Sequence, residues 1–299
     1  MGQPASPAQR LTLEADSAAL SDRRWETLRR LGHHWGAVIG FTLLAVVALA
    51  ALLAPLLTDY DPVKINPPDR NQPPSAEHWL GTDQFGRDIF TRVVYGARIS
   101  LPVGLIAVAI AAVVGLALGL LAGYYGKLLD ATVMRLIDIM LAFPGILLAL
   151  VVVTILGPSL QNVMIAVGVS EIPRYTRLVR GSVLSARENL YVDAARVSGV
   201  RDLMILIRHI LPNVVGPIVV LATLSVGSAI LAAAGLSFLG LGAQPPRPEW
   251  GAMLADGRQT LSSQWWISTM PGFAIALTVL AVNMAGDGLR DVLDPRLRV

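Results

Sequence analysis

The sequence predicts an all-α integral membrane protein with six transmembrane helices and both termini in the cytoplasm. Of its 299 residues, 54% are hydrophobic and only 15% are charged, whereas a soluble domain carries about a quarter charged residues. The charged residues also leave long stretches of the chain without Asp, Glu, Lys or Arg. These stretches are 31–58, 99–126, 139–170, 209–246 and 259–286.

The lengths of these stretches assign the spans. A bilayer core about 30 Å thick needs about 20 apolar residues for one spanning helix. Four stretches fit one helix each, but 139–170 is too long and contains the turn signal Gly157-Pro158-Ser159. It is therefore divided into spans at 132–156 and 160–176, which gives six.

The basic residues orient these spans. With the N-terminus inside, 17 of the 24 Lys and Arg residues fall on cytoplasmic segments, as expected of loops on that side. The first helix follows a polar tail and is too long for a cleavable signal; a signal anchor is the alternative. The predicted parts are a cytoplasmic tail at 1–30, with a short amphipathic helix at 17–30, then the first helix with a proline-rich outer loop at 31–80, and a core with five helices at 81–299.

Several kinds of chemistry have no support in this sequence. It contains no cysteine, which excludes disulfides, thiolate metal sites and cysteine nucleophiles. Its four histidines lack metal-ligand spacing, and the nearest approach to a phosphate-binding loop, Gly123-Tyr-Tyr-Gly126-Lys127, is spaced wrongly. The basic residues form no nucleic-acid patch. No catalytic, cofactor or metal site is predicted, so any ATP would be bound by another chain.

Two pairs of opposite charges stand near the inner ends of predicted spans. Arg135 with Asp138, and Asp287 with Arg290, are each spaced i, i+3 on one helix face. They are either interfacial pairs or parts of an inner gate. Because the span centres carry no charges, a standalone ion-coupled secondary transporter is disfavoured, as is a membrane-embedded enzyme.

The longest cytoplasmic loop, 177–212, carries the most informative segment. Asp193 favours a helix start through its charge, Ala194 and Ala195 keep one face small, and Gly199 permits a tight turn. A second helix is expected at 201–210, ending before Pro212. The two helices would form a knob that fills a groove on another protein; the alternative is an amphipathic surface loop.

This segment resembles the "EAA" loop of permease subunits in ATP-binding-cassette importers, E-A-A-x3-G-x9-I-x-L-P. Asp193 stands in place of Glu, and His209 in place of Ile. The remaining positions match the pattern at Ala194, Ala195, Gly199, Leu211 and Pro212.

Three further segments resemble the C-type permease of dipeptide and oligopeptide importers. They are residues 80–101, which contain the sequence LGTDQFGRDIFTR, residues 237–251, which contain the sequences SFLGLGAQPP and PEWG, and residues 286–295, which have the sequence GDGLRDVLDP. The resemblance covers about residues 30–299 and implies the type I importer permease fold. It also implies that segments 81–92 and 240–251 form an outer gate or contact a binding protein; self-capping loops are the alternative. The residues concerned are Asp83, Arg87, Asp88, Gln244, Glu249 and Trp250.

The resemblance further implies a non-catalytic pore subunit in a bacterial or archaeal inner membrane. Its expected partners are a B-type permease, two cytoplasmic ATPase subunits that bind ATP and Mg, and an extracytoplasmic substrate-binding protein. Loop 177–212, which we call the coupling loop, would transmit nucleotide-driven movement to the spans. Peptides are the expected cargo, and glutathione or nickel is the alternative.

The absence of native cysteine makes the predicted topology directly testable. Single cysteines in place of Asp69 and Gln259 should react with an impermeant maleimide in intact cells, and one in place of Arg187 should not. Labelling at position 187 from outside would contradict the orientation.

Overall fold

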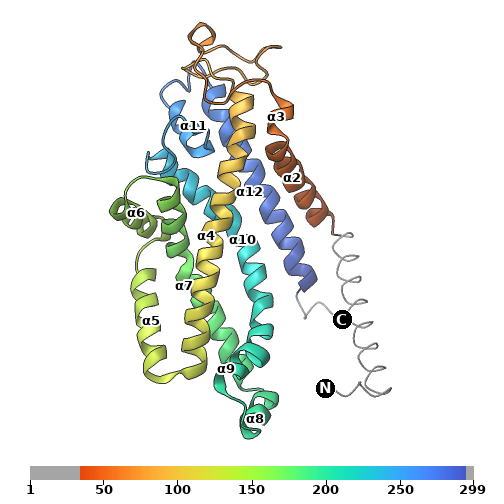
Figure 1. Cartoon of the computed structure of the whole chain (residues 1–299), viewed down its shortest axis with the longest axis vertical. Coiled ribbons are helices and arrows are strands. Elements are labelled where there is room, and N and C mark those ends of the chain that lie inside the picture. The colour runs from red at the N-terminus through yellow and green to blue at the C-terminus, as the bar shows by residue number, and fades with distance from the viewer. Residues whose placement is uncertain (1–33, 294–299) are drawn as a thin grey trace, which may run out of the picture.

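The computed structural model describes residues 34–293, and within this range every regular element is a helix. The long helices run side by side, with α8 and α9 at one end and α11 and the outer loops at the other (Figure 1). In chain order the elements are α2 (Trp35–Leu52), α3 (Ala54–Leu57), η1 (Pro67–Asp69), α4 (Ile89–Tyr125), α5 (Lys127–Leu141), α6 (Gly145–Leu156), α7 (Leu160–Arg187), α8 (Leu190–Val197), α9 (Asp202–Ile205), η2 (Leu206–Ile210), α10 (Leu211–Phe238), α11 (Trp250–Asp256) and α12 (Trp266–Leu293).

The most extensive helix packing joins α4 to α7. Three glycines of α4 recur every four residues, and each faces an α7 side chain that recurs at the same interval. The pairs are Gly115 with Tyr175, Gly119 with Val179, and Gly123 with Val183. A Cβ atom on Gly119 would lie 2.5 Å from the Cβ of Val179, so only glycine permits this approach. Apolar helices in lipid associate through such small-residue contacts. We call these three pairs the glycine seam.

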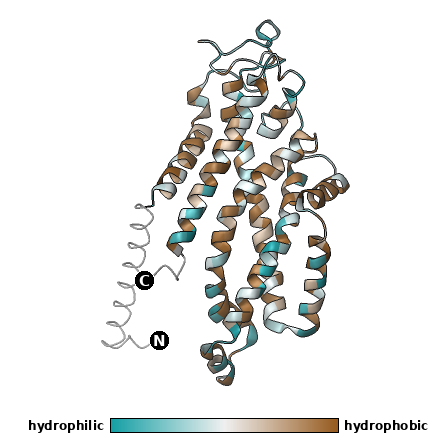
Figure 2. Ribbon diagram, turned by 180° about the vertical axis from the view of Figure 1, so that it is seen from behind, coloured by the Kyte–Doolittle hydropathy of each residue, from teal (hydrophilic) through white to brown (hydrophobic). Residues whose placement is uncertain are grey.

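The other long helices extend this packing. α10 packs against α4, α7 and α12, and α2 lies along α12. The contact between α2 and α12 again uses small residues, since a Cβ on Gly40 would lie 2.5 Å from the backbone nitrogen of Ala285. Hydrophobic residues predominate along the lengths of these helices, while hydrophilic residues gather toward the two ends (Figure 2).

The count of six spans is not confirmed. Within residues 34–293, four helices are long and apolar enough to cross a membrane: Trp35–Leu52, Ile89–Tyr125, Asp202–Phe238 and Trp266–Val292. The bent pair α5 and α6 would make a fifth span. The predicted span at 160–176 lies within α7, which is 28 residues long but carries several charged residues.

The segment predicted as one span at 132–156 is not one straight helix. α5 and α6 are separate helices that meet at an angle of 94°. Pro144 stands immediately before α6, and a proline disfavours helical backbone in the residue that precedes it. The turn predicted at 157–159 is confirmed, because α6 ends at Leu156 and the Ser159 side chain caps α7 by accepting from Asn162 N at 3.1 Å.

Two predicted helix ends also need correction. The sequence predicts a helix that begins near Phe85, with Thr82 or Asp83 as its cap. The helix begins instead at Ile89, because Asp88 is its cap and accepts from Thr91 N at 2.7 Å. The helix expected at 201–210 does not end before Pro212 but continues to Phe238. Pro212 is accommodated in the first turn of α10, where a missing N–H costs little, directly after the π-helical turn at 206–210. The tail at 1–30 lies outside the described residues.

The glycine seam yields a matched pair of substitutions. Gly119→Ala places a methyl group against Val179, and overpacking of this kind typically costs about 1–3 kcal/mol of folding free energy. Gly181→Ala on α7 meets no atom within 4 Å and should gain roughly 0.5–1 kcal/mol from helix propensity. Thermal unfolding of the purified variants in detergent compares them. Equal melting temperatures would contradict the packing described.

Candidate functional site

The predicted coupling loop forms a short helix, α8, but Asp193 does not start it. α8 begins at Leu190 after the cap residue Asn189. Asp193 lies in the first turn and pairs with Arg196 at 3.2 Å on the exposed surface. Gly199 follows α8 with a φ of +76°, a conformation that glycine adopts readily and other residues adopt at a cost.

The loop presents an apolar surface to its surroundings. Leu190 is 86% exposed, Val197 is 90% exposed and Leu203 is 64% exposed. Ala194 is also exposed, whereas Ala195 is buried against the core. An apolar patch of this kind is typical of a protein–protein contact. Figure 1 shows α8 and α9 as a tip below the long helices. Leu211 and Pro212 lie in the first turn of α10.

The coupling loop is attached to the inner end of α4. The hydroxyl group of Tyr124 donates to Asp202 at 2.6 Å, and the Arg196 guanidinium lies 5.6 Å from the centroid of the Tyr124 ring. Arg187, at the end of α7, donates to the Gly123 carbonyl at 3.0 Å. No sequence pattern singles out Tyr124, because its partners, Asp202 and Arg196, lie more than 70 residues further along the chain.

At the opposite end, segments 59–92 and 240–257 interlock, and we call them the outer layer. Asp83 stands at its centre, accepting from Arg87 Nε at 2.6 Å and lying 3.6 Å from Arg92 Nε. Arg87 reaches on to Asp256 of α11 at 3.5 Å. Asp83, Arg87 and Arg92 are at most 4% exposed. A buried charge is tolerated when paired and hydrogen-bonded, so this cluster joins the two segments.

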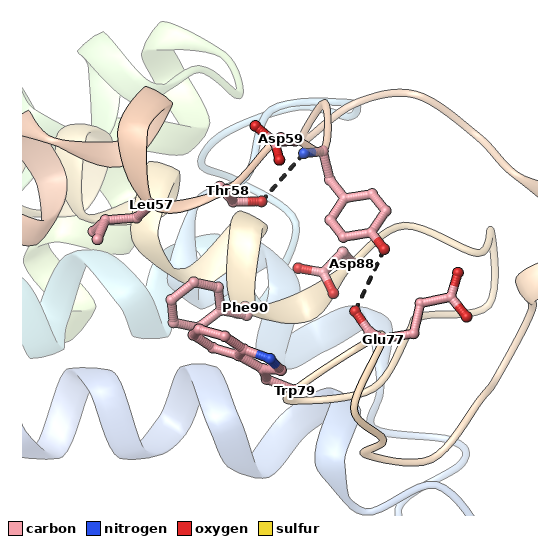
Figure 3. Close-up of a pocket in the computed structure, with 8 residues that line it drawn as sticks. Leu57, Thr58, Asp59, Glu77, Trp79, Asp88 and Phe90 are labelled. Carbon is pink, nitrogen blue, oxygen red and sulfur yellow. Dashed lines mark hydrogen bonds between the residues drawn. The ribbon is translucent and has the colours of Figure 1, made fainter.

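Asp88 belongs to the same layer. Besides capping α4, it lies 3.0 Å from Nδ1 of the buried His78. Figure 3 shows Asp88 beside a pocket of about 410 Å³ whose rim also carries Glu77, Trp79 and Phe90. The rings of Trp79 and Phe90 lie 5.0 Å apart.

Glu249 and Trp250 anchor the second segment. The Glu249 carboxylate caps α11 by accepting from Gly251 N and Ala252 N at 3.0 and 2.9 Å. Burial raises the pKa of Glu249, and these backbone donors oppose the shift. The indole of Trp250 is buried and donates to the Val93 carbonyl at 2.9 Å. Gln244 is exposed and bonds only to backbone carbonyls of its own loop.

Burial raises the pKa of Asp256 as well, while Arg87 and Arg92 oppose the shift. A carboxyl group whose pKa is raised on folding favours the folded state most at low pH, where it is protonated, and this contribution is lost as the pH rises through the folded pKa. The arginines therefore limit the rise in the pKa of Asp256 without reversing it.

The two predicted inner pairs do not form as expected. Asp138 of α5 pairs with Arg177 of α7 at 2.6 Å rather than with Arg135. Within the described residues, Asp287 and Arg290 of α12 make no ion pair with each other; the nearby Asp291 pairs with His34 at 3.0 Å. Asp138 reaches Arg177 on another helix because α7 packs against α5. A gating role for these residues stays a prediction.

The structure is a bundle of apolar helices with an exposed, anchored loop at one end and an interlocked layer at the other, and comparison with known families places this bundle among transport permease subunits. The chain belongs to the family of binding-protein-dependent transport system inner membrane components, whose pattern it matches over residues 115–299. Residues 24–74 match the N-terminal transmembrane domain of oligopeptide transport permease C.

Similar proteins support this assignment. The chain is 53% identical to the dipeptide transport system permease protein DppC of Alkalihalophilus pseudofirmus, covering 91% of this chain and 90% of that one. It is 48% identical to the glutathione transport system permease protein GsiD of Pectobacterium atrosepticum, covering 90% of each. The fold matches a chain of the inward-facing MetNI methionine ABC transporter with a TM-score of 0.54 and 20% identity, covering 68% of this chain and 97% of that one. The fold is therefore that of an ABC importer permease.

The buried cluster predicts that Asp83 is indispensable to the outer layer. Asp83→Ala leaves Arg87 and Arg92 buried without their common partner, and breaking a buried ion pair costs about 3–5 kcal/mol. The exposed Asp59 provides the control, since surface substitutions usually change stability by about 0.5 kcal/mol or less. Thermal unfolding of Asp83→Ala and Asp59→Ala, with limited proteolysis of the outer loops, measures the difference. Similar stability of both variants would show that the cluster is not structural.

Proposed function

We propose that this chain is the pore-forming permease subunit of an ATP-driven importer for di- or oligopeptides in a bacterial or archaeal inner membrane. The observation that carries the cargo class is the 53% identity to a dipeptide permease over nine-tenths of both chains. Identity to a di/tripeptide permease of Pseudomonas aeruginosa, at 44%, points to the same cargo.

In this proposal the chain itself does not hydrolyse ATP. It pairs with a homologous B-type permease to enclose the path, and two cytoplasmic ATPase subunits bind ATP and Mg below it. An extracytoplasmic binding protein delivers the substrate from the opposite side. Closure of the ATPases would move the coupling loops and rock the helices between inward-open and outward-open states, an alternating-access cycle.

The coupling loop is the proposed ATPase contact. Its exposed apolar side chains, Leu190 and Val197, would enter a groove on the ATPase, and Gly199 would provide the turn that presents them. Tyr124 and Arg187 connect this loop to α4. A displacement of α8 would therefore be passed to the inner end of the longest helix.

The outer layer is the proposed face toward the binding protein. Of the residues assigned to it from sequence, only Gln244 is exposed for direct contact; Asp83, Arg87, Asp88, Glu249 and Trp250 are buried. We therefore propose that these five shape and hold the outer face. Arg135, Asp138, Asp287 and Arg290 remain candidates for an inner gate.

Glutathione is the second candidate cargo, favoured by the 48% identity to a glutathione permease. One experiment separates the two. The complete complex is reconstituted in proteoliposomes with its binding protein, and uptake of labelled dipeptide and labelled glutathione is measured with ATP inside. ATP-dependent dipeptide uptake supports the proposal; uptake of glutathione alone would replace it with the second candidate.

The coupling role predicts graded effects at two positions. Gly199→Trp adds bulk at the docking surface and strains a residue at φ +76°, so ATPase binding should weaken about tenfold for each 1.4 kcal/mol lost. Asp193→Ala removes only an exposed ion pair, typically worth about 1 kcal/mol or less. ATPase co-purification and uptake are compared at matched membrane abundance. Normal transport by Gly199→Trp would remove the coupling role from this loop.

A further inference from the structure

A groove of about 740 Å³ runs between α7, α10 and α12. Residues of α10 make up most of its wall, but Arg174 of α7 and Arg290 of α12 also line it. Charged side chains within membrane segments rarely face lipid and usually face a protein interior or a water-filled path. The charge on the α7 side therefore indicates that this groove is wet when the complex is assembled.

A carboxylate lies about one helical turn from Arg174 along α7, beyond the residues that line the groove. Glu171 precedes Arg174 by three residues on α7, so the two side chains share one helix face. Glu171 lies near the middle of α7, and its Oε2 atom is buried without a hydrogen-bond partner among the described residues. A buried acceptor without a hydrogen-bond partner costs free energy. A donor supplied by another molecule would therefore stabilise the Glu171 carboxylate.

The other charges of α7 are already satisfied. Arg177 pairs with Asp138 at 2.6 Å, and Arg180 binds Asp130 through two contacts of 2.5 and 2.7 Å. Glu171 and Arg174 make no ion pair with any described residue. One negative and one positive charge therefore remain, about one helical turn apart, for something outside this chain.

We propose that Glu171 and Arg174 bind the two charged ends of a short zwitterionic peptide on its way through the membrane. The Glu171 carboxylate accepts hydrogen bonds from the N-terminal ammonium group, and the Arg174 guanidinium donates to the C-terminal carboxylate. This inference rests on the proposed peptide cargo. It extends that proposal to a binding site on this chain, at the groove between α7, α10 and α12.

The dimensions suit this ligand. Side chains three residues apart have Cβ atoms roughly 5–6 Å apart, and two extended residues span at most about 7 Å. The groove, at about 740 Å³, is much larger than one side chain of a neighbouring subunit would fill. Its apolar wall offers contact to varied peptide side chains, while the two charges fix the ends that every peptide shares.

The test uses the cysteine-free chain in the complete complex without the binding protein. Leu178 lines the groove one turn beyond Arg174, so Leu178→Cys reports on its occupancy through the labelling rate with a charged methanethiosulfonate. Dialanine should slow this labelling, whereas N-acetyl-dialanine, which lacks the ammonium group, should not. Ile165→Cys lies on another face of α7, and its labelling rate should not respond to either compound.

Charge-removing variants identify the residues responsible. Added to Leu178→Cys, Glu171→Gln or Arg174→Gln should raise the dialanine concentration needed for half-protection by about tenfold or more, which is about 1.4 kcal/mol in binding free energy. Glu171→Asp keeps the charge and should retain most of the protection. This conservative variant separates loss of the charge from damage to the helix.

Three results would overturn the inference. These are an unreactive cysteine at position 178 in the assembled complex, equal protection by dialanine and its acetyl derivative, or unchanged protection in both charge-removing variants. Uptake of labelled dialanine by the complete transporter with its binding protein is measured in parallel. Uptake without protection contradicts only the site in this groove, whereas absence of uptake contradicts the proposed cargo.

Discussion

The rest of the structure depends on the close approach of α4 and α7. Without side chains on Gly115, Gly119 and Gly123, the two helices can pack with their backbones near each other. This contact fixes how α7 presents Arg177 and Arg180 to α5 and how its inner end meets the coupling loop. Lipid supplies little hydrophobic driving force for helix association. Close packing along the glycine seam must therefore hold the two helices together.

Charge is distributed in three different ways along the molecule. At the outer end, Asp83 and its arginines are buried and serve the fold. At the inner end, the Asp193–Arg196 ion pair of the loop is exposed, and so are the apolar side chains of Leu190 and Val197. Between the two ends, ion pairs join α5 to α7, whereas Glu171 and Arg174 form none with residues 34–293. The same residue types therefore have different roles. These roles depend on how buried each charged side chain is and on whether a side chain of opposite charge lies nearby.

The sequence predicted the helical class, most helix positions, the turn at 157–159 and the place of the loop around Gly199, because these depend on composition and local backbone preferences. It did not predict the elbow before Pro144, since a long apolar stretch looks the same whether straight or bent. It also paired Asp138 with Arg135, its neighbour in sequence, whereas the partner is Arg177 from another helix. Glu171 escaped notice because a search for charge-free stretches places it at an edge, although it lies near the middle of α7.

The single continuous helix α4 has 37 residues and therefore a length of about 56 Å. Asp88 caps one end within the outer layer, and Tyr124 holds the coupling loop near the other. Such a rod acts as a lever: a tilt of about 10° about one end carries the other end through about 10 Å. A small rotation at one end of α4 thus becomes, at its other end, a displacement as wide as a helix.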